Sequence, residues 1–308
     1  MLLRKILVAL AASTATATAL AAPSPAAARA ATEAGPAAAP AAGPAAAQAA
    51  GPAAAPAAGP AAAQAAGPAA APAGARAATP TSATARAAAA GNPVIVVAGL
   101  STPALGYEPL AARLRADGFR VSIFQLPGLG LGDIADSARA FSTYVDQVRA
   151  STGAARVDLV AHSEGGLVSR YLIRNLGGGT KVGRYVSLGT PHYGTYVADI
   201  AKFLGLGSCL GIVACQQMAI GSSFLTALND GDDTPGDVRW TAVRTLQDEL
   251  VRPVDNATLA DGATNVLIQS WCPLRLVGHL GLVLDGTTYT VVRGALTDSP
   301  VRPDCYAL

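Results

Sequence analysis

The segment VDLVAHSEGG, residues 157–166, decides the fold expected of this chain. It begins with an apolar, β-rich run typical of a buried strand, and residues 167–176 then carry apolar side chains at helical spacing. A serine between such a strand and such a helix lies on a strained turn, with its hydroxyl exposed above the sheet. The positions two before and two after the serine must be small, and Ala161 and Gly165 meet this need around Ser163. The segment predicts a nucleophilic serine; an ordinary strand–turn–helix with a chance serine is the alternative.

A serine becomes a strong nucleophile only when a base takes its proton and a third group orients that base. The chain has three histidines from which the base can come. His162 adjoins Ser163 and is expected to point away from the hydroxyl, so we assign it a structural role. His192 follows the next apolar run, whereas His279 follows the last strand-like run. His279 is therefore the predicted base.

The acid that orients the base is expected between Ser163 and His279, at the end of another strand. The strand-like run RWTAVRTL covers residues 239–246, and QDELV follows it directly. Asp248 is the predicted acid. Its neighbour Glu249 is the alternative.

Four separated blocks in this order carry a resemblance to a known family. They are AHSEGG (161–166), SLGTPHYGT (187–195), TLQDELVRPVDNATL (245–259) and CPLRLVGHLGLVLD (272–285). Together they resemble the secreted bacterial lipases of the class 2 group, which have the α/β-hydrolase fold. The resemblance extends from Asn92 to the C-terminus.

The resemblance implies Ser163 as nucleophile, Asp248 as acid and His279 as base. It also implies that the backbone N–H groups of Leu100 and Glu164 bind the oxyanion. The chain departs from the family at one point. Such lipases often have His-Gly after the first strand, whereas this chain has Ala98-Gly99, so a hydrogen bond from that histidine to nearby backbone is missing.

The first ninety residues differ in composition from the rest. Residues 1–21 combine a charged start, a short apolar core and a small-residue cleavage site, which predicts a signal peptide and a secreted, extracellular protein. Residues 22–90 are nearly all Ala, Pro and Gly, with GPAAAPAAGPAAAQAA starting at Gly35 and again at Gly51. Pro and Gly interrupt each nascent helical turn and no large apolar group is present, which predicts a disordered linker. Alanine in this linker inflates the hydrophobic content of 51%.

Residues 91–308 are then expected to form one α/β-hydrolase catalytic domain. Apolar strand-like runs alternate with segments of helical periodicity, which predicts a doubly wound, mostly parallel sheet flanked by helices. Besides the strand and helix around Ser163, the expected strands are 94–97, 119–124, 182–187, 239–246 and 264–269, and the expected helices are 107–116, 137–151 and 288–296.

The periodicity loosens between Thr195 and Asp237, which predicts a small cap-like insertion over an acyl-binding groove. An ordinary helix pair packed on the core is the alternative. Four aspartates, Asp230, Asp232, Asp233 and Asp237, lack the spacing of an EF-hand and are interpreted as a solvated turn. We therefore expect no metal site.

Four cysteines in an exported chain predict disulfides, for which three pairings are possible. We favour Cys209–Cys215, which closes a small loop in the insertion, and Cys272–Cys305, which ties the C-terminal tail to the loop carrying His279. The formal net charge is +2 and the chain has no basic patch, so nucleic acid is not an expected partner.

These features together predict a secreted serine ester hydrolase, a lipase that acts through an acyl-enzyme and needs no cofactor. Its expected partners are a lipid or other ester substrate and a lipid interface, and we expect a monomer. Two alternatives remain open. One is an esterase or polyester hydrolase with an open groove, and the other is a non-catalytic exported surface protein on a hydrolase scaffold.

Overall fold

The computed structural model describes residues 91–209 and 211–308. The expected signal peptide (1–21) and repeat linker (22–90) lie outside the described residues. Within the described part, no helix combines the length and apolar character that a membrane crossing requires.

Six strands form one sheet, in the order β2-β1-β3-β4-β5-β6, and every neighbouring pair is parallel. Strand β3 lies between β1 and β4, so its carboxyl end, where Ser163 follows, lies near the middle of the sheet. The strands are β1 (Val94–Val97), β2 (Val121–Phe124), β3 (Val157–His162), β4 (Val182–Leu188), β5 (Arg239–Arg244) and β6 (Thr264–Leu267).

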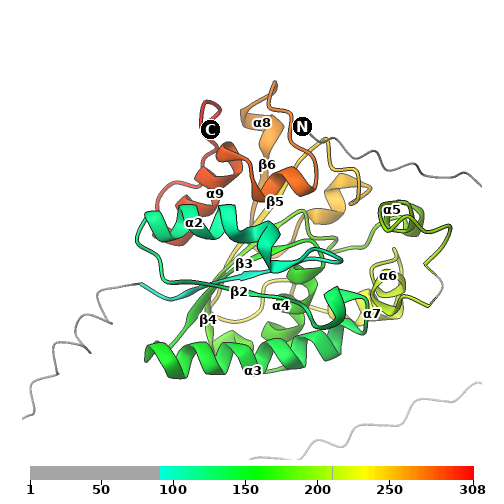
Figure 1. Cartoon of the computed structure of the whole chain (residues 1–308), viewed down its shortest axis with the longest axis horizontal. Helices are drawn as coiled ribbons and strands as arrows, with labels where there is room; N and C mark the ends of the chain where they lie inside the picture. The colour runs from blue at the N-terminus through cyan, green and yellow to red at the C-terminus, as the bar shows by residue number, and fades with distance from the viewer. Residues whose placement is uncertain (1–90, 210) are drawn as a thin grey trace, which may run out of the picture. The chain divides into compact units, whose positions relative to one another are not determined.

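Helices cover both faces of the sheet (Figure 1). Helices α2 (Glu108–Ala116) and α9 (Gly286–Thr297) pack on one face, and α3 (Ile134–Thr152) and α4 (Glu164–Asn175) pack on the other. The residues of strand β1 are all apolar because both faces of this strand are buried. Its first and third residues belong to the core under α2 and α9, and its second and fourth belong to the core under α3 and α4. The expected doubly wound fold class is confirmed, with a sheet that is parallel throughout.

Some element bounds differ from those expected, for local reasons. Helix α3 begins at Ile134 rather than at residue 137, because the Asp133 side chain caps it by accepting the Asp136 N–H at 2.9 Å. Helix α9 begins at Gly286 because the Asp285 side chain accepts the Thr288 N–H in the same way. Strand β6 is shorter than expected, since Ile268–Trp271 form the one-turn helix α8. Short 3₁₀ helices cover Ala104–Tyr107, Pro127–Gly130, Gly178–Thr180, Val254–Ala257 and Leu280–Val283.

The insertion between Thr195 and Asp237 holds three short helices, α5 (Val197–Phe203), α6 (Val213–Gln217) and α7 (Ser223–Leu228). They lie together at one end of the sheet, at the right of Figure 1.

The acidic turn that follows α7 is not wholly solvated, so that expectation is wrong for Asp233. Its carboxylate is buried and pairs with the buried Arg170 of α4 at 3.0 Å. It also accepts the Ala260 N–H at 2.9 Å and the Tyr193 hydroxyl. A guanidinium in the core requires a counterion, and Asp233 supplies the charge.

Candidate active site

Strand β3 runs into a sharp turn at Ser163, which has the backbone angles φ 54° and ψ −128°. A positive φ is rare for residues other than glycine and marks local strain. Glycine is needed two residues later, because a Cβ at Gly165 would collide with the carbonyl oxygens of Ala98 and Val97. Strain and close packing together hold the Ser163 side chain above the end of the sheet, where it lines a pocket.

Asp248 lies after the end of β5 and contacts His279 directly. The Nδ1 atom of His279 is 3.0 Å from Asp248 Oδ1 and 2.9 Å from Oδ2, and both side chains are buried. The Oδ1 atom also accepts the N–H groups of Leu250, at 2.9 Å, and Val251, at 2.7 Å. These bonds fix the carboxylate so that the imidazole takes the tautomer with its proton on Nδ1.

The alternative acid, Glu249, lies on the same loop but does not contact the imidazole. Its Oε2 atom accepts the backbone N–H of His279 at 2.9 Å. The geometry therefore favours Asp248 as the partner of the ring and gives Glu249 a part in holding the loop that carries His279.

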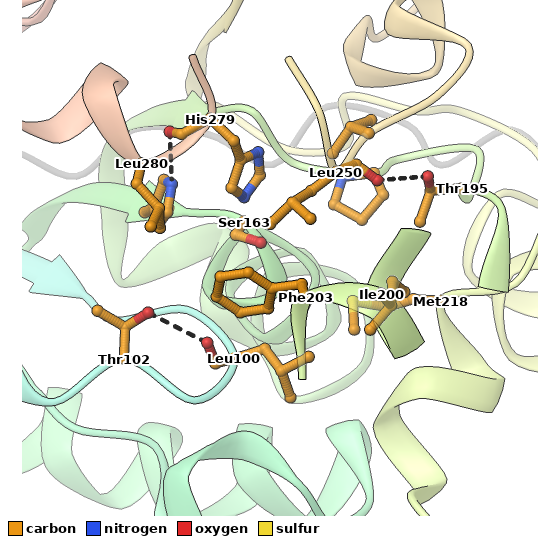
Figure 2. A pocket seen from close by; sticks show the side chains of 13 residues that line it. Leu100, Thr102, Ser163, Thr195, Ile200, Phe203, Met218, Leu250, His279 and Leu280 are labelled. Carbon is orange, nitrogen blue, oxygen red and sulfur yellow. Dashed lines mark hydrogen bonds between the residues drawn. The ribbon is translucent and has the colours of Figure 1, made fainter. Parts of the chain in front are cut away.

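Ser163 and His279 line the same pocket, and the imidazole of His279 lies beside the serine side chain (Figure 2). The Nε2 atom of His279 is buried and has no hydrogen-bond partner in the described part of the chain. The structure thus brings Asp248 onto His279, and His279 beside Ser163, without a hydrogen bond from Nε2 to the serine.

The two expected oxyanion donors flank Ser163. Among the described residues, the backbone N–H groups of Leu100 and Glu164 donate to no acceptor, so both are free for a ligand oxygen. The loop of Leu100 is held on each side, because the Gly99 N–H donates to the Tyr107 hydroxyl at 2.7 Å and the Ser101 N–H donates to the Leu129 carbonyl at 2.7 Å.

The other two histidines are buried in hydrogen-bonded positions, as structural roles require. His162 turns its ring toward Tyr107 and the backbone of His279, and burial with nearby His279 lowers its pKa to about 3. The Nε2 atom of His192 is 3.0 Å from Ser187 Oγ, and burial with nearby Arg170 lowers the pKa of His192 well below its ordinary value.

The pocket around Ser163 is small, about 20 Å³, and mostly apolar. Three of its lining residues come from the insertion, namely Ile200 and Phe203 of α5 and the nearby Met218 (Figure 2). The insertion therefore forms one wall of the pocket, as a cap does. The sequence carries no motif that marks these three residues, because their place depends on how the insertion folds back over the sheet.

All four cysteines are paired in the favoured combination. Cys209 bonds to Cys215, joining the segment after α5 to α6, and the two Cα atoms are 5.8 Å apart. Cys272 bonds to Cys305, joining the end of α8 to the C-terminal tail, with the Cα atoms 5.3 Å apart.

The side chain of Glu164 is a feature that sequence reasoning missed. It is fully buried, and neither carboxyl oxygen has a hydrogen-bond partner among the described residues. Burial raises its pKa well above the ordinary value, so the group is held as the neutral acid. Gly130 makes room for it, since a Cβ there would collide with the carboxyl.

Replacing Glu164 by glutamine is expected to stabilise the protein at alkaline pH relative to the wild type. A raised pKa means that the folded state binds the proton more tightly than the unfolded state, so wild-type stability falls as pH rises above about 4.5. Glutamine does not ionise and avoids this loss. The difference in unfolding free energy between variant and wild type should grow by up to about 1.4 kcal/mol per pH unit, until the pH reaches the pKa of the buried acid.

Urea unfolding at about pH 5, 7 and 9 measures this difference. The control is Glu108→Gln, which removes an exposed carboxylate paired with Arg115 and should change stability by a similar amount at each pH. A difference for Glu164→Gln that does not vary with pH would contradict a neutral, buried Glu164.

The parallel sheet, the serine on the turn after an inner strand and the adjacent histidine–aspartate pair define the class of protein as the α/β-hydrolases. Solved structures agree on the fold. Lipase B of Aspergillus fumigatus aligns with a TM-score of 0.59 and 20% identity, over 69% of this chain and 53% of that chain. The mature lipase BlEst2 of Bacillus licheniformis aligns with a TM-score of 0.55 and 19% identity, over 68% of this chain and 93% of that chain.

The family model for lipase (class 2) matches residues 134–287, half of the chain, and the chain belongs to this family. Two curated relatives are triacylglycerol lipases, from Pseudarthrobacter phenanthrenivorans and Burkholderia plantarii, each 31% identical over 170 residues. The aligned region is 52% of this chain and 51% and 46% of the respective relatives. The chain thus spans about half the length of the curated relatives it matches.

Proposed function

We propose that this protein is a serine ester hydrolase that cleaves carboxylic esters of lipids. One observation carries the proposal: Asp248 orients His279, whose Nε2 has no partner among residues 91–209 and 211–308 and lies in the same pocket as the strained Ser163. A nucleophile, a base and a group that orients the base are the parts that acyl transfer requires.

In the first half of the proposed reaction, Ser163 Oγ attacks the ester carbonyl carbon and its proton passes to Nε2 of His279. Asp248 keeps the other ring proton on Nδ1 and stabilises the imidazolium that forms. The negative charge develops on the carbonyl oxygen, where the free N–H groups of Leu100 and Glu164 would donate to it. Each such donor is worth about 3–4 kcal/mol in comparable sites. The alcohol then leaves with the proton from Nε2, and the acyl group remains on Ser163.

In the second half, water attacks the acyl-enzyme carbonyl and gives a proton to Nε2 of His279. The tetrahedral intermediate collapses, Ser163 Oγ takes that proton back, and the carboxylic acid is released. No electron transfer occurs. His279 Nε2 carries each proton, first from Ser163 to the departing alcohol and then from water back to Ser163.

Apolar lining supports lipid esters as substrates. Phe203 and Leu280 line the pocket and also reach the surface, with exposed fractions of 37% and 41%. Contact with a lipid interface through such residues is part of the proposal.

Secretion is a further part of the proposal, and the two disulfides support it because disulfides persist in oxidising compartments.

The pocket volume favours a second candidate within the same chemistry. About 20 Å³ is room for little more than a water-sized group, so this space by itself does not hold a long acyl chain. The alternative function is therefore that of an esterase, whose preferred substrates are esters with short acyl groups.

Initial rates on p-nitrophenyl esters of increasing acyl length, from acetate to palmitate, separate these candidates. A maximum at long chains supports a lipase, and a maximum at acetate or butyrate supports an esterase. Labelling with a p-nitrophenyl phosphonate tests the mechanism, because the phosphonyl group should appear on the peptide containing Ser163 in mass spectrometry. A folded protein with neither turnover nor label would overturn the proposal in favour of a non-catalytic role.

A further inference from the structure

We propose that Tyr107 and His162 are positioning residues, which link the oxyanion loop to the base through one chain of hydrogen bonds. This inference rests on the proposed function and extends it to two side chains outside the triad. The residue after β1 is Ala98, whose methyl side chain cannot hydrogen-bond, and the Tyr107 hydroxyl accepts the N–H of the next residue, Gly99.

The chain of hydrogen bonds starts at the oxyanion loop and ends at the base. The Gly99 N–H is 2.7 Å from the Tyr107 hydroxyl, and that hydroxyl is 2.9 Å from His162 Nδ1. The Nε2 atom of His162 is 3.2 Å from the backbone carbonyl oxygen of His279. Tyr107 and His162 are both buried, so water does not compete for these bonds.

The direction of every bond in the chain follows from its two ends. The His279 carbonyl can only accept, so His162 must carry a proton on Nε2. The pKa of His162, about 3, leaves the ring neutral, so its Nδ1 atom accepts. The Tyr107 hydroxyl therefore donates to Nδ1, and its oxygen accepts the Gly99 N–H. Burial raises the pKa of Tyr107 to about 12, which keeps that hydroxyl protonated at neutral pH.

Each end of the chain holds backbone next to a reacting group. Gly99 precedes Leu100, whose N–H is a proposed oxyanion donor, and a Cβ on Gly99 would lie 2.9 Å from Ser163 Cβ. At the other end, the His279 carbonyl belongs to the residue that carries the base. The bonds therefore set where the oxyanion donor and the base lie relative to Ser163, and displacements of about 1 Å in such groups can cost about a hundredfold in rate.

Tyr107→Phe removes the hydroxyl and leaves the rest of the side chain in place. We expect kcat for p-nitrophenyl butyrate to fall about 10- to 100-fold with KM little changed, because the donors are needed most in the transition state. The matched control is Tyr185→Phe, which removes another buried hydroxyl, bonded to the Gly166 carbonyl at 3.1 Å. It should lower the melting temperature and leave kcat per titrated active site unchanged.

Two variants of His162 each remove one of its two hydrogen bonds and retain the other. His162→Asn places an amide near the position of Nδ1 and should retain the Tyr107 bond, whereas His162→Gln reaches the position of Nε2 and should retain the bond to the His279 carbonyl. We expect each variant to lose part of kcat. If the bonds act as one unit, Tyr107→Phe combined with His162→Gln should lose less than the product of the two single losses.

Nitrogen NMR of the wild-type protein, labelled with ¹⁵N-histidine, tests the same chain without any turnover. His162 should give the signals of a neutral ring with its proton on Nε2, assigned by their absence in His162→Gln. A proton on Nδ1 would overturn the inference, as would full kcat in a Tyr107→Phe protein that is destabilised like Tyr185→Phe. Both of these results are compatible with an active wild-type enzyme, so they overturn the inference alone. A wild-type protein that neither hydrolyses esters nor takes the phosphonate label overturns the proposed function itself.

Discussion

Ser163→Ala and His279→Ala should each lower kcat for p-nitrophenyl ester hydrolysis by about 10⁴-fold or more while the protein stays folded. The physical reason is that serine attacks only when a positioned base removes its proton, and either substitution ends that transfer. The double variant should be no slower than the slower single variant, because the groups act as a unit. Asp248→Asn should also lose several orders of magnitude, since asparagine cannot hold the proton on Nδ1 of His279 in the same way.

Initial rates of p-nitrophenyl ester hydrolysis measure these losses. Each rate is divided by the concentration of folded protein, which circular dichroism gives. Two matched controls sharpen the result. His192→Ala removes a buried histidine that bonds to Ser187 and should retain substantial activity. Glu249→Gln keeps an acceptor for the His279 N–H and should lose far less than Asp248→Asn. Full activity in folded Ser163→Ala would refute the mechanism, and a loss at His192 equal to that at His279 would refute the choice of base.

Removal of the Cys272–Cys305 disulfide, by replacing both residues with alanine, should produce the second large effect. The two cysteines are 33 residues apart in sequence, so the bond closes a long loop that includes His279. In the loop-closure model such a bond stabilises the folded protein by about 4 kcal/mol, against about 2 kcal/mol for the six-residue separation of Cys209–Cys215. Turnover should fall as well, because the loop carrying the base is no longer tied to the tail.

Urea unfolding of the two double variants, under non-reducing conditions, compares the bonds within one protein. Cys209→Ala/Cys215→Ala serves as the matched control, and it should mainly alter preference among acyl lengths, since α5 forms a wall of the pocket. Peptide mapping of the wild type checks the pairing itself. A peptide linking Cys209 to Cys272 or Cys305 would contradict both the pairing and the bracing of the histidine loop.

The inner strands β1 and β3 were predictable from the sequence because each is a short, largely apolar run that is buried on both faces, whereas the edge strands β2 and β6 are partly exposed. Strands β1 and β3 are Val94–Val97 and Val157–His162, and they pair in parallel, as the helical segments between them allow. Element ends were less predictable. The start of α3 depends on a side-chain cap from Asp133, and the spacing of apolar residues does not predict such a hydrogen bond.

The candidate site divides in the same way. Ser163 stands out in the sequence because a strand, a strained turn and a helix are local features, and His279 stands out because histidines are few. The choice between Asp248 and Glu249 needed the structure, since neighbouring carboxylates differ only in which part of His279 they reach.

The sequence alone predicted the doubly wound sheet and the position of the serine turn, because these depend on local periodicity and spacing, whereas the order of the predicted triad came from the resemblance to the α/β-hydrolases. Only the tertiary structure decided the partners of the buried polar groups. It pairs Tyr107 with His162 and Arg170 with Asp233, and it leaves the carboxyl of Glu164 without a partner within the described part of the chain. Tyr107 and His162 are 55 residues apart, and Arg170 and Asp233 are 63 apart. Contacts over such separations depend on which loops the folded sheet brings together, and no local pattern of residues encodes that outcome.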